Sequence, residues 1–148
     1  MKLLSRSPAE TETVGVKLGR LLKAGMLVKL YGELGTGKTT MVKGIARAFG
    51  IEKDDVISPS FTIITEYNSS PRLYHLDLYR ISGSRDLENT GLWDCIEENA
   101  ITVIEWPEHA EDELPKDAVS VRLSHKGLDE REIVIEGIDE EDWHNLQA

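Results

Sequence analysis

The spacing of apolar residues near the start of the chain predicts an amphipathic helix. Ser7 suits the N-cap of this helix, Pro8 suits its first position, and Glu10 completes a capping box. The apolar residues that follow recur on one helical face: Val14, Leu18, Leu21 and Leu22. Gly25 is expected to end the helix, because glycine is the residue that most readily terminates one.

A strand followed by a second helix is expected next. Residues 26–31 form an apolar run of strand length. From residue 39 to residue 49, apolar side chains again fall on one helical face: Met41, Val42, Ile45, Ala46 and Phe49. Gly50 follows as a stop signal. The pattern therefore predicts a strand, a short connection and a helix.

Strand-like patterns dominate the middle of the chain. Residues 61–67 and 73–79 are expected to pair as a hairpin around a turn at 68–71. Residues 84–99 suit one or two short helices, interrupted near Gly91. These elements, alternating with the helices before them, indicate an α/β protein.

Three further strands complete the predicted sheet. Residues 101–106 form a buried strand that ends in a carboxylate. Alternation at 119–123 and at 133–135 predicts two strands joined by a turn at 125–127. Because hairpins are combined with strand–helix units, we expect a mixed parallel and antiparallel sheet flanked by helices. The last ten residues, 139–148, are acidic and are expected to be a frayed tail.

The connection between the strand and the second helix carries a phosphate-binding pattern. Residues 32–39 read GELGTGKT and match G-x-x-x-x-G-K-[ST] at every fixed position. Gly35 and Gly37 lack a Cβ, so the backbone can turn its N–H groups onto an anion. Lys38 can place its ammonium against the β- and γ-phosphates, and the Thr39 hydroxyl is placed to ligate Mg²⁺. The sequence therefore predicts a nucleoside triphosphate site.

A magnesium ion beside such a loop needs a second anchor at the end of a neighbouring strand. Glu105 ends the predicted strand 101–106, and Asp77 lies on an alternating strand whose same face carries His75. One carboxylate can hold the metal while the other orients or deprotonates the attacking water. The pattern leaves open which does which.

Each of these residues also has a structural interpretation. Glu105 can be an exposed acid at a strand end, and Asp77 can form an ion pair with Arg72 or Arg80. For His75 we expect a structural hydrogen bond and not a catalytic role. The residue after Glu105, Trp106, can serve packing or function.

Composition limits the choice of function. The chain has 148 residues, which suits one domain, 1–148, with no separate domain for a second substrate. Its 17 basic and 27 acidic residues make it a poor autonomous binder of nucleic acid, so an RNA role should go through a partner. The single cysteine, Cys95, is expected to be a small buried residue. With no signal-peptide or membrane-span pattern, we expect a cytoplasmic protein.

Four motifs together resemble the TsaE (YjeE) family. They are GELGTGKTT at 32–40, SPSFT at 58–62, HLDLYR at 75–80 and EWPE at 105–108. Their order and spacing agree with the family over roughly residues 7–124. Ser60 stands where threonine is usual, which keeps the hydroxyl.

The resemblance implies a single P-loop ATPase domain that uses ATP and Mg²⁺. Family members are required for the threonylcarbamoyladenosine modification beside the anticodon of tRNAs that read ANN codons. They act with a TsaD–TsaB heterodimer, which carries the transferase chemistry. The resemblance therefore implies a nucleotide switch on that heterodimer, with tRNA contacted through the complex.

The motifs also carry over residue roles. The phosphates would be held by the Lys38 side chain and by the loop backbone, namely Gly35, Thr36, Gly37, Lys38, Thr39 and Thr40. Thr39 and Glu105 would hold Mg²⁺, and Asp77 would support hydrolysis. Residues 58–62 would act as a switch-like loop that senses the γ-phosphate, and the start of the first helix, near residues 10–13, would contact the base.

Two other functions remain as alternatives. A small-metabolite P-loop kinase would need an Arg-rich lid, whereas residues 108–113 are acidic. A non-enzymatic module would bind ATP without cleaving it. For a hydrolase, the absence of an arginine finger predicts slow turnover in isolation, since that group is worth about 10³–10⁵ in rate. Arg80 is the candidate within this chain, with a salt bridge as its alternative role.

Overall fold

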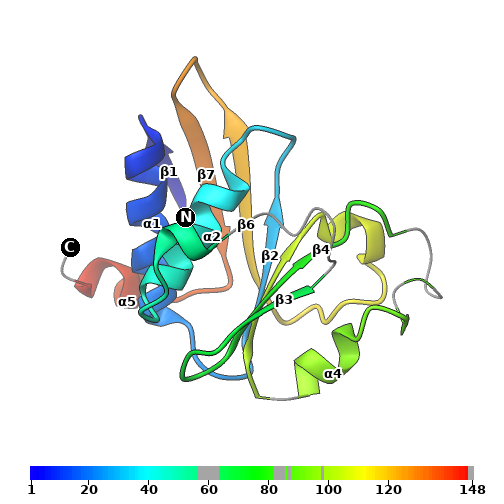
Figure 1. Ribbon diagram of the computed structural model, residues 1–148. Coiled ribbons are helices and arrows are strands. Elements are labelled where there is room, and N and C mark those ends of the chain that lie inside the picture. The colour runs from blue at the N-terminus through cyan, green and yellow to red at the C-terminus, as the bar shows by residue number, and fades with distance from the viewer. Residues whose placement is uncertain (57–63, 82–85, 87, 98, 147–148) are drawn as a thin grey trace.

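The computed structural model describes residues 1–56, 64–81, 86, 88–97 and 99–146. Within these residues one seven-stranded sheet has the order β1-β7-β6-β2-β5-β4-β3 (Figure 1). The strands are β1 Lys2–Ser5, β2 Leu27–Tyr31, β3 Ile64–Tyr67, β4 Leu73–Asp77, β5 Ile101–Glu105, β6 Val119–His125 and β7 Arg131–Glu136. Strands β4, β5, β2 and β6 are parallel, and the pairs β1–β7, β6–β7 and β3–β4 are antiparallel. The predicted mixed α/β sheet is confirmed.

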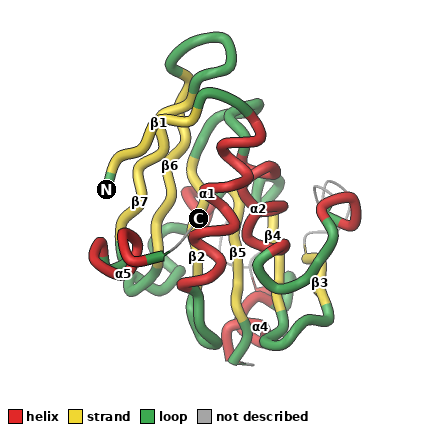
Figure 2. The backbone as a smooth tube through the Cα atoms, turned by 90° about the vertical axis from the view of Figure 1, so that its left-hand side faces the viewer, coloured by secondary structure: helices red, strands yellow, loops and turns green. Residues whose placement is uncertain are grey.

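Helices cover both faces of this sheet (Figure 2). Helices α1 (Pro8–Leu21), α2 (Lys38–Arg47) and α5 (Glu140–Asn145) pack on one face, and α4 (Leu92–Glu97) and the 3₁₀ turn η2 (Pro107–Ala110) lie on the other. A second 3₁₀ turn, η1 (Lys53–Asp55), follows α2. The backbones of helices α1 and α2 are in contact at Gly44. A Cβ added there would lie 2.1 Å from the Glu12 carbonyl oxygen, so glycine is needed at this position.

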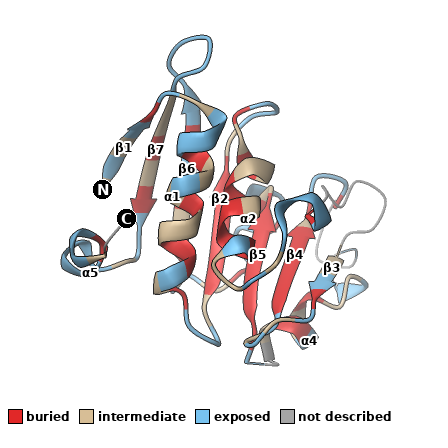
Figure 3. Ribbon diagram, turned by 60° about the vertical axis from the view of Figure 1, so that its left-hand side comes forward, coloured by how far each residue is buried: buried red, intermediate tan, exposed pale blue. Residues whose placement is uncertain are grey.

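The central parallel strands are the most buried part of the sheet (Figure 3). Every residue of β2 and β5 is buried. This double-sided burial explains why both strands have near-continuous apolar sequences. The carboxyl ends of β2, β5 and β4 meet at one edge of the sheet, where the loop before α2 begins. Open α/β sheets bind ligands at this edge.

The expectation of a frayed tail from residue 139 is wrong for the described residues. Asp139 caps helix α5 by accepting hydrogen bonds from the N–H groups of Glu141 and Asp142. Trp143 is 4% exposed and joins the core beneath α1 and α2, with the Lys17 ammonium 4.6 Å from its ring centroid. Burial of the Trp143 side chain holds the helix against the core, and the acidic residues beside it remain exposed to solvent.

Several element boundaries also differ from the expectations. Strand β1 was not predicted; it is four residues long and is held by pairing with β7. The strand expected at 73–79 ends at Asp77, and residues 61–63 of the strand expected at 61–67 lie outside the described part of the chain. The interruption expected near Gly91 is confirmed, because Gly91 has φ 83° and α4 begins after it.

Candidate functional site

The loop that joins β2 to α2 has the geometry expected of a phosphate-binding loop. Gly35 and Gly37 have φ angles of 78° and 101°, in the left-handed region that glycine tolerates. Gly37 is the N-cap residue of α2, so the unpaired N–H groups of the first helical turn face the loop. Thr36 closes the loop by donating from Oγ1 to the Glu33 carbonyl oxygen at 2.8 Å. The concave backbone and the helix N-terminus form a site suited to phosphate.

Lys38 is held inside this loop. Its Nζ donates to the Gly32 carbonyl oxygen at 2.5 Å and lies 3.5 Å from the centroid of the Trp106 ring. The residue is 6% exposed. Burial lowers the pKa of Lys38, and the nearby carboxylates, of which Glu105 has the largest effect, oppose that shift. The ammonium is therefore a desolvated cation whose partners within the protein are a carbonyl oxygen and an aromatic ring.

Seven of the eight predicted site residues line one cavity of about 330 Å³. Glu105 and Asp77 come from the ends of β5 and β4, where their Cα atoms are paired in register. The seven predicted residues in the lining are Gly35, Gly37, Lys38, Thr39, Thr40, Asp77 and Glu105, joined there by Leu34 and Trp106. Thr36 lines the two neighbouring cavities instead. The motifs therefore converge in space although they are up to 70 residues apart in sequence.

Asp77 is a half-buried carboxylate in this cavity. It accepts a hydrogen bond from the Tyr79 backbone N–H at 2.9 Å. Burial raises the pKa of Asp77 and Glu105 raises it further, while the Tyr79 N–H, His75 and Lys38 lower it. Of the ion-pair partners considered above, Arg72 instead contacts Glu66 at 3.6 Å, and Arg80 is exposed outside the cavity lining.

Glu105 is buried and hydrogen-bonded to His75. The Nε2 atom of His75 lies 2.6 Å from Oε2 of Glu105, and the two side chains are 0% and 5% exposed. The structural hydrogen bond expected for His75 is confirmed, and Glu105 is not an exposed acid. Among the described residues, the other ring nitrogen of His75, Nδ1, has no hydrogen-bond partner.

Trp106 takes part in the site and not in packing alone. Its backbone has φ 57°, a left-handed conformation that is strained for a tryptophan. Its ring covers the Lys38 ammonium and contacts the rings of Tyr79 and His109, with centroids 5.0 and 5.8 Å away. The sequence left the role of this residue open. Pro107 favours an extended backbone at Trp106, and the left-handed conformation observed contradicts that preference.

Arg131 was missed by the sequence analysis. From the start of β7, its Nε and Nη2 atoms donate to the carbonyl oxygens of Thr36 and Gly35, each at 3.2 Å. It also lines a cavity of about 140 Å³ on the other side of the loop, together with Ser7 and Thr11 near the start of α1. Of the positions 10–13 expected near the base, Thr11 thus faces a cavity beside the loop. No local pattern marks Arg131, since its partners lie 95 and 96 residues away.

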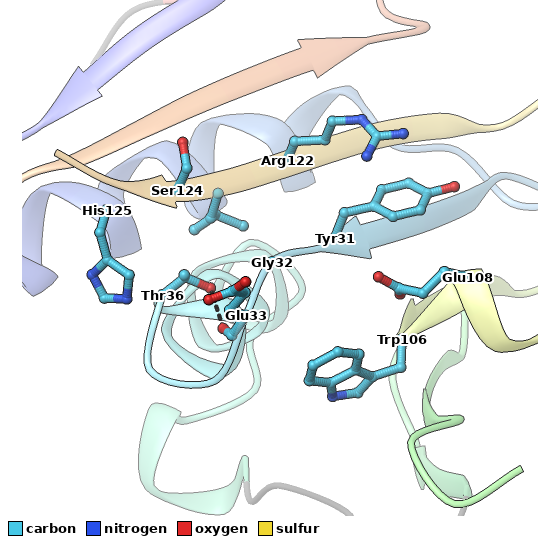
Figure 4. A pocket seen from close by; sticks show the side chains of 10 residues that line it. Tyr31, Gly32, Glu33, Thr36, Trp106, Glu108, Arg122, Ser124 and His125 are labelled. Carbon is cyan, nitrogen blue, oxygen red and sulfur yellow. Dashed lines mark hydrogen bonds between the residues drawn. The ribbon is translucent and has the colours of Figure 1, made fainter.

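A larger cavity of about 410 Å³ adjoins the loop (Figure 4). Tyr31 and Arg122 project into it from β2 and β6, and the Arg122 guanidinium lies 4.0 Å from the Tyr31 ring centroid. Trp106 and Glu108 form the opposite wall. Apart from Thr36, none of the predicted site residues lines this cavity.

The donor set of the 330 Å³ cavity fits a magnesium ion. Thr39 offers a hydroxyl oxygen, and Asp77 and Glu105 offer carboxylate oxygens. Mg²⁺ prefers oxygen ligands and binds proteins through one or two carboxylates, keeping water and phosphate as its other ligands. The described residues contain no cluster of three or more His, Cys, Asp or Glu side chains that would make a metal cage. That arrangement suits a metal shared with a phosphate ligand.

Three other expectations concern residues away from the cavity. The switch-like segment 58–62 lies outside the described residues. Cys95 is 7% exposed, in agreement with the small buried residue expected. In the described part of the chain, no helix is both long enough and apolar enough to span a bilayer.

Comparisons with known proteins agree with this geometry. The family model described as "Threonylcarbamoyl adenosine biosynthesis protein TsaE" matches residues 5–133. The crystal structure of YdiB from Bacillus subtilis superposes with a TM-score of 0.72 at 33% sequence identity, covering 90% of this chain and 82% of that one.

Curated relatives carry the name tRNA threonylcarbamoyladenosine biosynthesis protein TsaE. The relative from Treponema pallidum is 38% identical over 135 residues, which cover 91% of this chain and 99% of that protein. The relative from Bacillus subtilis is 35% identical over 139 residues, with coverage of 93% and 86%. The chain therefore belongs to the TsaE family of tRNA threonylcarbamoyladenosine biosynthesis proteins.

Proposed function

We propose that this protein is a magnesium-dependent ATPase of the cytoplasm that acts as a nucleotide switch on a TsaD–TsaB complex during tRNA modification. The observation that carries the proposal is the shared cavity, into which the loop, Lys38, Thr39, Asp77 and Glu105 all open. These are the groups that phosphoryl transfer requires: a phosphate cradle, a cation, metal ligands and a carboxylate for the attacking water.

The residues divide this work as follows. The N–H groups of the loop and of the first turn of α2 bind the phosphates. Lys38 leaves the Gly32 carbonyl and the Trp106 ring to reach the phosphate oxygens. Thr39 and Glu105 hold Mg²⁺, which when bound neutralises charge on the phosphates. Asp77, held by the Tyr79 N–H, orients the attacking water.

Partner dependence follows from the composition of the described cavity lining. The described residues that line the cavity include no arginine, so the transition state has no arginine finger from within this lining. Isolated turnover is then slow, and a partner that adds such a group or orders the site accelerates it. With a net charge of −10, the chain contributes little to holding tRNA, which we assign to the partner complex.

The test is an ADP-release assay with and without TsaD–TsaB, combined with calorimetry of ATP binding. We expect slow hydrolysis that requires Mg²⁺, faster hydrolysis with the partners, and loss of most ATP affinity in Lys38→Ala. Unchanged ATP binding by Lys38→Ala would remove the loop from the nucleotide site. Transfer of phosphate to a small metabolite would instead support the kinase, and binding without cleavage under any condition would support a binding module.

A further inference from the structure

His75 and Glu105 form a buried hydrogen-bonded pair. Of the two, only Glu105 has a role in the function proposed above. We propose that His75 is a positioning residue that fixes the carboxylate of Glu105 so that its free oxygen faces the metal position in the cavity. The proposal rests on the proposed function, because it takes Glu105 to be a magnesium ligand.

Strand alternation places the two side chains beside the nucleotide site. His75 and Asp77 are two residues apart on β4, so they project from the same face of the sheet. Glu105 is paired in register with Asp77 on β5. His75 therefore lies two residues before the strand ends that carry the two carboxylates. Its ring reaches diagonally across to Glu105 on the neighbouring strand.

The hydrogen bond leaves one carboxylate oxygen of Glu105 available. As a magnesium ligand Glu105 is ionised, and an ionised carboxylate can only accept. The 2.6 Å contact then has the His75 proton on Nε2, which donates to Oε2. Oε1 is not used in that bond, and Glu105 lines the cavity together with Thr39. A glutamate side chain has three rotatable bonds, and a bond to one oxygen of its carboxylate restricts where the other can lie.

The orientation of the Glu105 carboxylate matters because a second carboxylate, that of Asp77, lies beside it. Asp77 emerges from the neighbouring strand end, and two like charges so placed repel each other unless each carboxylate is held apart. Asp77 is held by the Tyr79 N–H and Glu105 by His75. Each carboxylate of the site thus has its own fixed hydrogen-bond donor.

Packing alone does not account for the choice of histidine. His75 is 0% exposed on a strand whose other buried members are mostly apolar, and the described residues leave its Nδ1 without a partner. An apolar side chain would satisfy packing there without a polar group to pair. The donor at Nε2 is the property that an apolar replacement would remove.

The test compares His75→Gln with His75→Asn in the full-length protein. Glutamine carries its amide nitrogen at about the position of Nε2, whereas the asparagine amide is one bond shorter and falls short of Glu105. The readout is the Mg²⁺ concentration that half-saturates the tightening of ATP binding, measured by calorimetry. ATP binding in EDTA is the metal-independent reference, and Leu73→Val on the same strand face controls for loss of packing in β4.

We expect His75→Asn to raise the half-saturating Mg²⁺ concentration about 10-fold or more. This is the range of affinity typically lost when a residue that hydrogen-bonds to a metal ligand is replaced. His75→Gln should stay within about threefold of the wild type, and binding in EDTA should be unchanged in both. Wild-type Mg²⁺ dependence in His75→Asn would overturn the proposal. Equal losses in the two variants, or a matching loss in Leu73→Val, would reduce His75 to a packing residue.

Glu105→Gln separates this inference from the proposed function. If Glu105→Gln shifts the Mg²⁺ dependence and His75→Asn does not, the positioning role fails while the metal assignment stands. If Glu105→Gln leaves the Mg²⁺ dependence unchanged, Glu105 is not a metal ligand, and both the assignment and the inference fail.

Discussion

Replacing Trp106 by leucine should make ATP bind more tightly. In the ligand-free structure the Lys38 ammonium lies 3.5 Å from the Trp106 ring centroid, which is a cation–π contact. In the proposed function the same ammonium binds the phosphates of ATP. Nucleotide binding must therefore break the contact with the ring, and its loss reduces the binding free energy. Leucine keeps an apolar side chain at the cavity wall and removes the π-system.

The magnitude follows from the burial of Lys38. Cation–π contacts contribute about 0.5–1 kcal/mol at exposed sites and about 2 kcal/mol when the cation is desolvated. The Lys38 residue is 6% exposed, so we place the contact at about 1–2 kcal/mol. Since 1.4 kcal/mol corresponds to a factor of ten, the ATP dissociation constant should fall about 5- to 30-fold. The hydrogen bond from Lys38 to Gly32 remains in the variant and is not part of this figure.

The assay is calorimetric titration with a non-hydrolysable ATP analogue at fixed Mg²⁺. A double-mutant cycle with Lys38→Ala isolates the contact, because the gain from Trp106→Leu should vanish when no ammonium is present. Trp93→Leu is the matched control, since Trp93 belongs to α4 and lies outside the cavity lining. Weaker binding by Trp106→Leu, or a gain that persists in the Lys38→Ala background, would refute the idea that the ring competes for the lysine.

Three further predictions concern catalysis, stability and pH. Asp77→Asn should slow hydrolysis by about 100-fold or more while ATP affinity changes little; reduced affinity at normal turnover would make Asp77 an architectural residue. Trp143→Ala should lower the unfolding free energy by about 3–5 kcal/mol and the melting temperature by about 10 °C, since the side chain is buried; a melting curve like that of the wild type would contradict its place in the core. Burial and the Glu111 carboxylate raise the pKa of Tyr31 above its ordinary value, so its contribution to stability is complete below about pH 10 and declines above it. Urea unfolding at about pH 8 and pH 11 should therefore show a smaller alkaline loss in Tyr31→Phe than in the wild type.

The local parts of the site could be predicted from sequence because their signals are local. The loop needs glycines at fixed offsets and a helix directly after it, and residues 26–50 carry all of these signals within one stretch. Glu105 and Asp77 were both selected by one rule, that a metal beside such a loop needs a second anchor at the end of a neighbouring strand. Apolar runs at 26–31 and 101–106 correctly indicated strands, and in the structure every residue of β2 and β5 is buried.

The contacts that complete the site could not be predicted, because each joins distant segments. His75 meets Glu105 across 30 residues, and Arg131 reaches the loop carbonyls across 95 and 96 residues. The spacing of apolar residues and the capping residues indicate whether a segment forms a helix or a strand. They do not indicate which other segment it contacts. Helix α5 shows the same limit. Its acidic residues are exposed, and the helix is held in place because Trp143 packs into a core formed by residues distant in sequence.

The electrostatic state of the cavity favours a metal–nucleotide complex over either component alone. Burial lowers the pKa of Lys38 and raises the pKa of Asp77, so both groups are charges held with too little solvation. Phosphate alone would favour the charged form of Lys38 but would add negative charge beside Asp77 and Glu105. A divalent cation alone would favour the carboxylates and disfavour the ammonium. Only a ligand that brings both charges relieves both groups, so we expect each component to raise the affinity for the other.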